Sequence, residues 1–266
     1  MRYTLHDLRR FAATRKLASL TCYDASFAGV LEDAGIDILL VGDSLGMVIQ
    51  GHSSTLAVTL GDVAYHTRAV ARRTRTAWII ADLPFGSYQA SPEQALRNAV
   101  ELMQAGADMV KLEGGEEMAA TVAFLVARGV PVCGHVGLTP QHVQTLGGYR
   151  IQGKDAAGAE RVLAGARAIQ DAGADMLVVE AVPQALAERI VAQRRALIIG
   201  IGASSGCDGQ VLVLHDMLGI TPGKRPRFVK DFLADGGSIP TAVRRYVEAV
   251  RSGAFPGPEH VYLDEH

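Results

Sequence analysis

The chain has 266 residues, of which 48% are hydrophobic and 20% are charged, so it contains ample apolar material for a large core. Its formal net charge of −2 provides no basic surface for nucleic acid or for an anionic membrane. The three scattered cysteines exclude a disulfide framework, and no apolar stretch has the length of a signal peptide or a membrane span. These features favour small-molecule chemistry in a reducing cytoplasm.

Short apolar runs alternate with segments of helical periodicity along the chain. Thr4 and Asp7 indicate the start of a short first helix. We predict strands at 18–22, 37–42, 77–81, 107–112, 130–134, 174–179, 196–201 and 211–214. We predict helices at 25–34, 62–73, 92–105, 116–128, 156–172, 183–193 and near 239–252. This alternation predicts a single-domain (β/α)8 TIM barrel over residues 1–266 with a short N-terminal helical extension; a doubly wound open sheet is the alternative.

A weak internal repeat runs through the predicted strands. The pattern Ala-Gly-x-Asp occurs at 34–37, 105–108 and 172–175, each time just before an apolar strand. These three strands are followed by Asp43, Glu113 and Glu180. In a TIM barrel the carboxyl ends of all strands open at the same mouth, where the fold places its chemistry. The repeat therefore predicts that the three acids meet.

The candidates for chemistry at the strand ends are Asp24, Asp43, Asp82, Glu113, His135 and Glu180. A single acid at such a position is more often a helix N-cap than a catalytic group. Five carboxylates at one mouth repel one another unless a cation neutralises them, so the set predicts a metal. Carboxylates without a His pair or thiolates suit Mg²⁺ better than zinc. We expect Asp43 and Asp82 to bind the metal, and Glu113 to bind it directly or through a water.

Lys111 lies two residues before Glu113, so both side chains project to the same side of their strand. If they face the lumen, Lys111 offsets part of the acid cluster and grips a substrate oxygen. A Schiff-base role, as in an aldolase, is the first alternative, and an outward lysine lying over a helix is the second. The predicted metal beside it favours the electrostatic role.

Glu180 closes the apolar run Leu-Val-Val and is followed by Ala-Val-Pro, which ends the strand. A carboxylate held partly out of water at this position is suited to general-base work. The alternative is a salt bridge to a cation at the barrel mouth. The glycine-rich stretch at 200–206 contains no Lys or Arg and lacks the context of a dinucleotide fingerprint, so we interpret it as a loop of close approach.

Nine short segments stand out: VGDSLG at 41–46, GH at 51–52, ADLPF at 81–85, VKLEGG at 110–115, VCGHVGLTP at 132–140, GGY at 147–149, EAVP at 180–183, DGQ at 208–210 and HD at 215–216. In order and spacing they resemble the ketopantoate hydroxymethyltransferase family, within a similarity that runs from about residue 18 to beyond 255. One such motif would be weak evidence, but this many in register is a strong resemblance.

The resemblance implies roles for the matching positions. Asp43 and Asp82 would bind one Mg²⁺ per subunit and contact the substrate, with Glu113 beside the metal. Ser44 and Lys111 would hold the carboxylate and neighbouring oxygens of a 2-oxo acid, His135 would line the same pocket, and Glu180 would be the base. The implied reaction is hydroxymethyl transfer from 5,10-methylenetetrahydrofolate to 3-methyl-2-oxobutanoate through a Mg-stabilised enolate, a step of pantothenate and coenzyme A biosynthesis. The family also suggests a homo-oligomer, a decamer.

One stretch departs from the family, which often has IPVIGIGAG where this chain has RALIIGIGAS at 195–204. Ser204 costs little unless its position needs a positive φ. We expect the loop at 203–207 to border the mouth, where the change would affect folate binding or flexibility. Two other classes of function stay open: a lyase or mutase with the same enolate chemistry, and a non-catalytic binding protein on a barrel scaffold.

Overall fold

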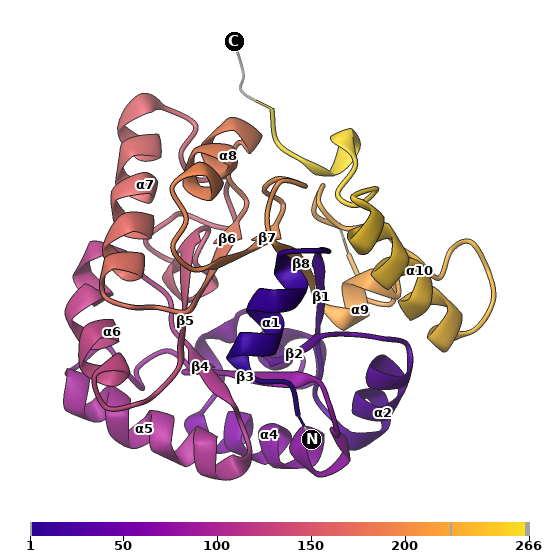
Figure 1. Ribbon diagram of the computed structural model, residues 1–266, viewed down its shortest axis with the longest axis horizontal. Coiled ribbons are helices and arrows are strands. Elements are labelled where there is room, and N and C mark those ends of the chain that lie inside the picture. Colours follow the sequence, from indigo (N-terminus) through magenta and orange to yellow (C-terminus); the bar gives the residue numbers. More distant parts are fainter. Residues whose placement is uncertain (1, 224, 264–266) are drawn as a thin grey trace.

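The computed structural model describes residues 2–223 and 225–263, and its eight parallel strands close into a barrel in which each strand pairs with the next and β8 pairs with β1 (Figure 1). The strands are β1 (Leu17–Thr21), β2 (Ile38–Val41), β3 (Trp78–Asp82), β4 (Met109–Lys111), β5 (Val132–Gly137), β6 (Met176–Glu180), β7 (Leu197–Ile201) and β8 (Gly209–Leu212). Almost every strand residue is buried, because helices cover the outer face and side chains fill the lumen. The predicted (β/α)8 barrel is confirmed.

Helices surround the barrel, and one precedes it (Figure 1). They are α1 (Leu5–Ala12), α2 (Ala25–Asp33), α3 (Leu45–Val48), α4 (Leu60–Arg73), α5 (Pro92–Ala105), α6 (Ala119–Val126), α7 (Ala156–Asp171), α8 (Gln184–Ala192), α9 (Leu214–Met217) and α10 (Ile239–Ser252). Short 3-10 turns occur at η1 (Thr55–Ala57), η2 (Glu116–Met118), η3 (Pro140–His142) and η4 (Pro258–His260). The predicted N-terminal cap is confirmed, because Thr4 and Asp7 form a reciprocal capping box at the start of α1. None of the helices in the described ranges is both long and apolar enough to span a membrane.

All eight strands begin and end within three residues of their predicted bounds, and two of the differences have a clear physical cause. β5 continues to Gly137, past the predicted end at 134, because its glycine-rich end pairs with β6. β8 begins at Gly209, two residues before its predicted start. A Cβ at Gly209 would lie 2.5 Å from the Leu17 carbonyl oxygen, so the glycine permits the contact that closes the barrel.

The loop at 203–207 does not border the mouth, and this expectation was wrong. Residues 202–208 contain no helix, and the chain returns from the top of β7 towards the N-terminal end, where Lys16 Nζ donates to the Gly206 and Cys207 carbonyls. Ser204 is fully buried, and its φ lies outside the left-handed region. Its hydroxyl accepts the Gly206 N–H at 3.0 Å, so serine is accommodated without strain.

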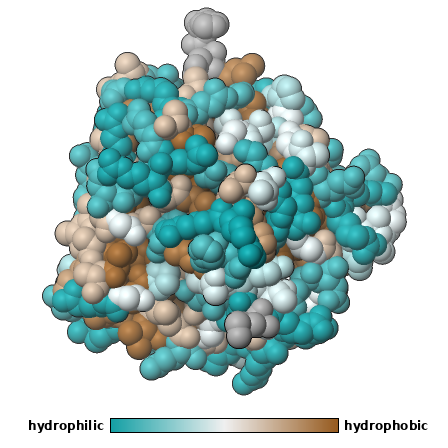
Figure 2. All heavy atoms as spheres, in the orientation of Figure 1, coloured by the Kyte–Doolittle hydropathy of each residue, from teal (hydrophilic) through white to brown (hydrophobic). Residues whose placement is uncertain are grey.

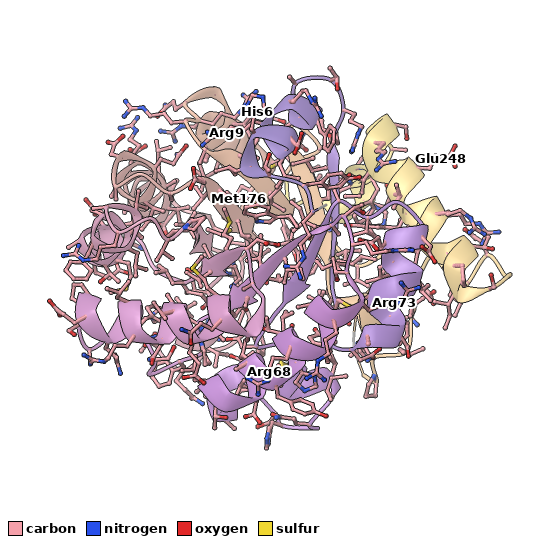
Figure 3. The ribbon with its side chains drawn as sticks, turned by 60° about the horizontal axis from the view of Figure 1, so that its bottom comes forward. His6, Arg9, Arg68, Arg73, Met176 and Glu248 are labelled. Atoms are coloured by element: carbon pink, nitrogen blue, oxygen red, sulfur yellow. The ribbon has the colours of Figure 1, made fainter. Side chains whose placement is uncertain are left out.

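Helix α1 lies across the N-terminal end of the barrel, in front of the strands in Figure 1. Arg2, just before it, pairs with Asp108 at 3.2 Å, and Arg9 pairs with Asp175 at 2.7 Å, so the segment is tied to two separate strand starts. The face that carries α1 is mostly hydrophilic in Figure 2. Figure 3 shows His6 and Arg9 on the outside of this end and Met176 of β6 inside the molecule. Helix α1 and its ion pairs therefore close this end of the barrel.

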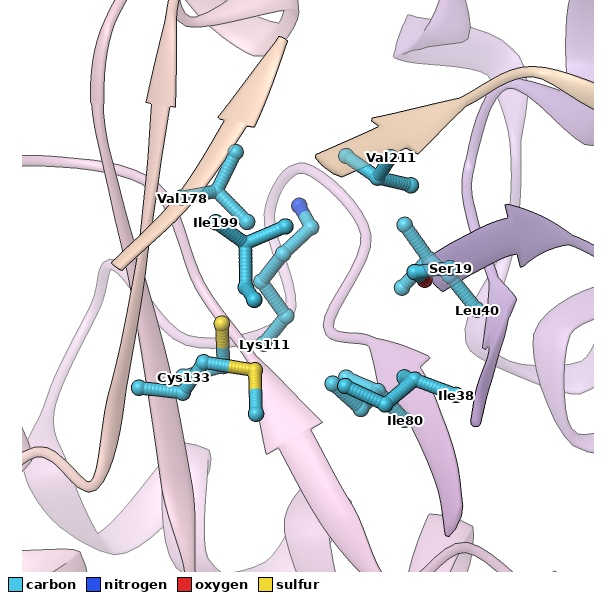
Figure 4. Close-up of a pocket in the computed structure, with 10 residues that line it drawn as sticks. Ser19, Ile38, Leu40, Ile80, Lys111, Cys133, Val178, Ile199 and Val211 are labelled. Atoms are coloured by element: carbon cyan, nitrogen blue, oxygen red, sulfur yellow. The ribbon is translucent and has the colours of Figure 1, made fainter. Parts of the chain in front are cut away.

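All eight strands contribute to a packed lumen, which leaves a cavity of only ≈ 10 Å³. Its lining is apolar apart from Ser19, Cys133 and Lys111, and Figure 4 shows the amine of Lys111 rising through it between Ile199 and Val211. The outward orientation considered for Lys111 is therefore excluded. The amine leads from this packed layer towards the open C-terminal mouth.

Candidate active site

The C-terminal ends of the strands surround a cavity of ≈ 1030 Å³. Five of the six candidate side chains line it, and all but Glu180 are at most 4% exposed: Asp43, Asp82, Glu113, His135 and Glu180. Asp24 is the exception. Its carboxylate accepts the Phe27 N–H at 2.8 Å and caps α2, so the helix-cap alternative is correct there.

Asp43 and Asp82 follow adjacent strands and are directly connected. Asp82 is the last residue of β3, and its Oδ2 accepts the backbone N–H of Asp43 at 3.0 Å. The other oxygen of Asp82 lies 3.1 Å from Lys111 Nζ, within ion-pair distance, but it has no hydrogen bond of good geometry. This buried carboxylate oxygen thus has an ion pair with Lys111 but no hydrogen bond.

Lys111 and Glu113 project to the same side of β4, as the two-residue spacing predicts. Lys111 Nζ lies 3.9 Å from Glu113 Oε1, and the two side chains are 4% and 1% exposed. The lysine is therefore surrounded by Asp43, Asp82 and Glu113. Burial opposes its charge, but these carboxylates outweigh burial and raise the pKa of Lys111 above its ordinary value.

The carboxylates perturb one another because few cations are available to them. Burial and the charges of Asp82 and Glu113 raise the pKa of Asp43 well above its ordinary value. Burial also raises the pKa of Asp82, although Lys111 opposes it. For Glu113 burial is outweighed by His135 and Lys111, so its pKa is lowered. Such an uneven set of buried acids is typical of a site built to hold an added positive charge.

His135 lies between two carboxylates of different strands. Its Nδ1 is 3.4 Å from Glu113 Oε1, and its Nε2 is 3.2 Å from Glu180 Oε2. Burial lowers the pKa of His135, but the two carboxylates outweigh it and raise this pKa to about 9. Near neutral pH the imidazolium therefore lies between the acid cluster and Glu180, which agrees with the alternative in which Glu180 pairs with a cation at the mouth.

The backbone around Glu180 is specialised on both sides. Ala181 has a φ of 47°, a left-handed conformation that costs a residue with a Cβ on the order of 1 kcal/mol. Gly137 of β5 has a φ of 91°, and a Cβ there would lie 2.2 Å from the Glu180 carbonyl oxygen. That oxygen accepts the Leu138 N–H at 2.8 Å. These contacts direct the Glu180 side chain, which is 13% exposed, into the cavity.

Ser44 is half-buried and lines the same cavity immediately after Asp43. Its hydroxyl lies 2.8 Å from the hydroxyl of Tyr23, which is 2% exposed. All the residues predicted to hold metal, substrate or proton therefore lie around a single cavity.

A divalent cation fits the donor set, although no three His, Cys, Asp or Glu side chains in residues 2–223 and 225–263 are already arranged around one point. Mg²⁺ commonly takes only one or two protein carboxylates and fills its other positions with water and substrate oxygens. Asp43 and Asp82 supply two such carboxylates, and Asp82 has the oxygen without a hydrogen bond. The all-oxygen set suits a hard ion.

Sequence reasoning missed several residues of the site. Gln141 is 3% exposed and hydrogen-bonds both Asp43 and Glu113, while the fully buried Tyr88 donates to Gln141. His52 and His215, which do not lie at strand ends, also line the cavity. Gln141 lies directly after the Thr-Pro that follows β5, a position that carries no pattern for its distant partners.

Solved structures with this architecture share its fold at low sequence identity. A phosphonopyruvate hydrolase structure aligns with a TM-score of 0.62 at 14% identity, covering 82% of this chain and 84% of that one. A 2,3-dimethylmalate lyase, described as a member of the PEP mutase/isocitrate lyase superfamily, aligns with a TM-score of 0.60 at 16% identity over 97% and 98% of the two chains.

Curated relatives are much closer in sequence. The 3-methyl-2-oxobutanoate hydroxymethyltransferase of Dechloromonas aromatica is 56% identical over 262 residues, which cover 98% of this chain and 96% of that protein. The protein of the same name from Paraburkholderia phytofirmans is 60% identical over 250 residues, covering 94% and 92%. The profile of the family described as ketopantoate hydroxymethyltransferase matches residues 2–258. This chain belongs to the ketopantoate hydroxymethyltransferase family.

Proposed function

We propose that this chain transfers a hydroxymethyl group from 5,10-methylenetetrahydrofolate to 3-methyl-2-oxobutanoate, with uptake of one water, to give 2-dehydropantoate in pantothenate biosynthesis. The observation that supports it best is the arrangement of Asp43, Asp82 and Glu113 on one side of His135 and Glu180 on the other, in one cavity. The names of relatives at 56–60% identity support the same reaction.

The difficult step is removal of the proton from C3 of the keto acid, next to the keto carbon. Glu180 takes this proton on its carboxylate, and the electron pair of the C–H bond forms the enolate. His135, 3.2 Å from Glu180 Oε2, holds the carboxylate in place. The enolate carbon then bonds to the one-carbon unit of the folate, whose two C–N bonds break. Water supplies the hydroxyl group of the product, and the C3 proton and one water proton end on the two nitrogens of the released tetrahydrofolate.

The acid cluster acts on the other side of the substrate. Asp43 and Asp82, with Glu113 beside them, would hold Mg²⁺, which supplies positive charge where the enolate oxygen develops. Lys111 is protonated, because its pKa is raised, so it attracts the substrate carboxylate and oxygens electrostatically. A protonated amine is a poor nucleophile, which disfavours the Schiff-base alternative. Ser44, whose hydroxyl is hydrogen-bonded to that of Tyr23, donates a hydrogen bond to the substrate from the wall of the cavity.

The cavity supports two substrates rather than one. At ≈ 1030 Å³ it is far larger than a keto acid needs, and apolar side chains such as Leu138, Val178 and Ile201 line it beside the acids. These walls exclude water from the reacting carbon, and the remaining volume accommodates a folate. A lyase or mutase would share the enolate chemistry but would not consume the folate.

The base is tested with Glu180→Gln, which keeps the size of the side chain but cannot accept the proton. We expect loss of C3–H/D exchange of 3-methyl-2-oxobutanoate in D₂O by at least about 10³-fold, followed by proton NMR. Binding of Mg²⁺ and of the keto acid should persist in calorimetry. Retained exchange in this variant would contradict the assignment of Glu180. The transfer itself would be contradicted if the wild type exchanges the C3 proton but forms no 2-dehydropantoate when 5,10-methylenetetrahydrofolate is added.

A further inference from the structure

Gln141 connects three strand ends through one side chain. It lies in η3, just after β5, and is 3% exposed. Its Nε2 donates to Asp43 Oδ2 at 2.9 Å and to the Leu83 carbonyl at 3.0 Å. Its Oε1 accepts from the Tyr88 hydroxyl at 2.7 Å and from Gln89 Nε2 at 3.3 Å. All four hydrogen-bonding positions of the amide are therefore in use.

The direction of this amide is determined by its partners. The carbonyl of Leu83 can only accept a hydrogen bond, and an ionised Asp43 can only accept. A flipped amide would place Oε1 against both of these oxygens, so only Nε2 can face Asp43. The buried hydroxyl of Tyr88 accepts the Glu113 N–H at 3.1 Å, and its hydrogen has two acceptors within reach, Oε1 at 2.7 Å and the Glu113 carbonyl at 3.1 Å; the shorter contact is consistent with this orientation.

The main chain of the same residue contacts a second acid. Gln141 N–H donates to Glu113 Oε2 at 2.9 Å. The other oxygen of Glu113 is left for His135 and Lys111, at 3.4 Å and 3.9 Å. One residue thus takes one oxygen of Asp43 through its side chain and one oxygen of Glu113 through its backbone.

We propose that Gln141 is a positioning residue that holds Asp43 in the orientation in which it binds a divalent cation; this rests on the proposed function, in which Asp43 is a metal ligand. The chemistry of an amide suits this role. It satisfies one buried carboxylate oxygen without bringing a positive charge that would repel the cation, whereas Lys111 already supplies the cationic partner of the cluster. Residues that orient metal ligands typically change metal affinity by 10–100-fold when they are replaced.

The experiment is titration calorimetry of the metal-free protein with MgCl₂. Gln141→Met keeps an unbranched side chain of similar length but removes every side-chain hydrogen bond, while the backbone contact to Glu113 remains. We expect the Kd for Mg²⁺ to rise about 10-fold or more. A Kd within twofold of the wild-type value, in a folded variant, would overturn the proposal.

Gln170→Met is the matched control, because it removes another buried glutamine far from the mouth. Gln170 is 7% exposed, lies at the end of α7, and its amide bonds only backbone groups of Ala166, Arg195 and Ala196. We expect a lowered Tm with an unchanged Kd for Mg²⁺. A rise in Kd equal to that of Gln141→Met would mean that loss of stability alone weakens the metal, and this result would also overturn the proposal.

A second variant keeps the test decisive if Gln141→Met does not fold. Gln141→Asn is shorter by one methylene and cannot span from Tyr88 to Asp43, so its Kd should also rise, by a smaller factor. An unchanged Kd here would contradict the positioning role. Failure of the proposed function itself is distinguishable, because the wild-type protein would then neither bind Mg²⁺ nor exchange the C3 proton.

Discussion

The two ends of the barrel neutralise their carboxylates in different ways. At the N-terminal end most acids have an arginine and a backbone N–H of their own: Asp37 pairs with Arg15 at 2.7 Å and accepts the Ala18 N–H, and Asp108 pairs with Arg2 and accepts the Ile79 N–H. At the C-terminal end four acids line one cavity, and Lys111 and His135 are each shared between two of them.

The difference separates stability from function within one fold. At the N-terminal end each paired acid connects adjacent strands, and its negative charge is already neutralised by an arginine. At the mouth, burial and the charges of Asp82 and Glu113 raise the pKa of Asp43, so an added cation gains from the repulsion between these acids. This agrees with the general division of TIM barrels into a catalytic C-terminal face and a stabilising N-terminal face.

The largest effect is expected from Asp43→Asn at the mouth. If Asp43 binds the metal as proposed, its replacement should reduce the C3–H/D exchange rate by about 10³-fold. The metal-free protein should nevertheless gain about 1 kcal/mol in free energy of unfolding, because a buried charge with a raised pKa is removed. Urea denaturation without metal and proton NMR of exchange measure the two effects. A loss of stability in the metal-free variant would contradict the repulsion on which the comparison depends.

Asp37→Ala is the corresponding change at the N-terminal end. It leaves Arg15 and Arg251 without their carboxylate and the Ala18 N–H without its acceptor. Because Asp37 is only 1% exposed, we expect the free energy of unfolding to fall by about 3 kcal/mol in urea denaturation. The exchange rate per folded molecule should not change. Asp37→Asn keeps a hydrogen-bond acceptor and is the control, so its free energy of unfolding should fall by less. An equal fall in the two variants would show that the charge of the carboxylate alone matters.

A smaller, pH-dependent effect is expected at Glu32, also at the N-terminal end. Burial opposes its charge, but the backbone N–H groups of Thr76, Ala77 and Arg75 outweigh burial and lower the pKa of Glu32 to about 2. A lowered pKa means that this contribution to stability is complete above about pH 4.5 and is lost as the pH falls towards 2.

Glu32→Gln should therefore be less stable than the wild type by about 1–2 kcal/mol at pH 7, a value reduced for solvent screening. The gap should narrow steadily between pH 5 and pH 2, measured by urea denaturation at each pH. A gap that is constant across this range would show that packing, rather than the charge of the carboxylate, is responsible.

Much of the fold was readable from local patterns. Apolar runs such as those of β2 and β7 are buried on both faces of a parallel sheet, so they stand out from the helical segments. The prediction failed where pairing, rather than hydropathy, decides a strand. The glycine-rich end of β5 becomes strand only because β6 lies beside it, and Gly209 starts β8 only because β1 closes the barrel there.

The candidate site was predictable to the level of its charged side chains. The strand-end rule located Asp43, Asp82, Glu113 and Glu180, because all parallel strands present their carboxyl ends at one mouth. It included Asp24, which caps a helix, since a cap and a ligand look alike in a single sequence. It missed Gln141, because a glutamine after a turn carries no pattern that reveals which distant carboxylates it reaches.

The sequence by itself determined that acids occur at both ends of three strands, since each Ala-Gly-x-Asp repeat has one acid before its strand and another after it. Only the tertiary structure decided which charged groups surround each of those acids. Closure of the barrel brings α1 and its arginines to the acids that precede the strands, and it crowds the acids that follow the strands around Lys111 and His135. The reason is physical: the charge environment of a carboxylate depends on neighbours that are distant in sequence, whereas hydrophobic periodicity is local.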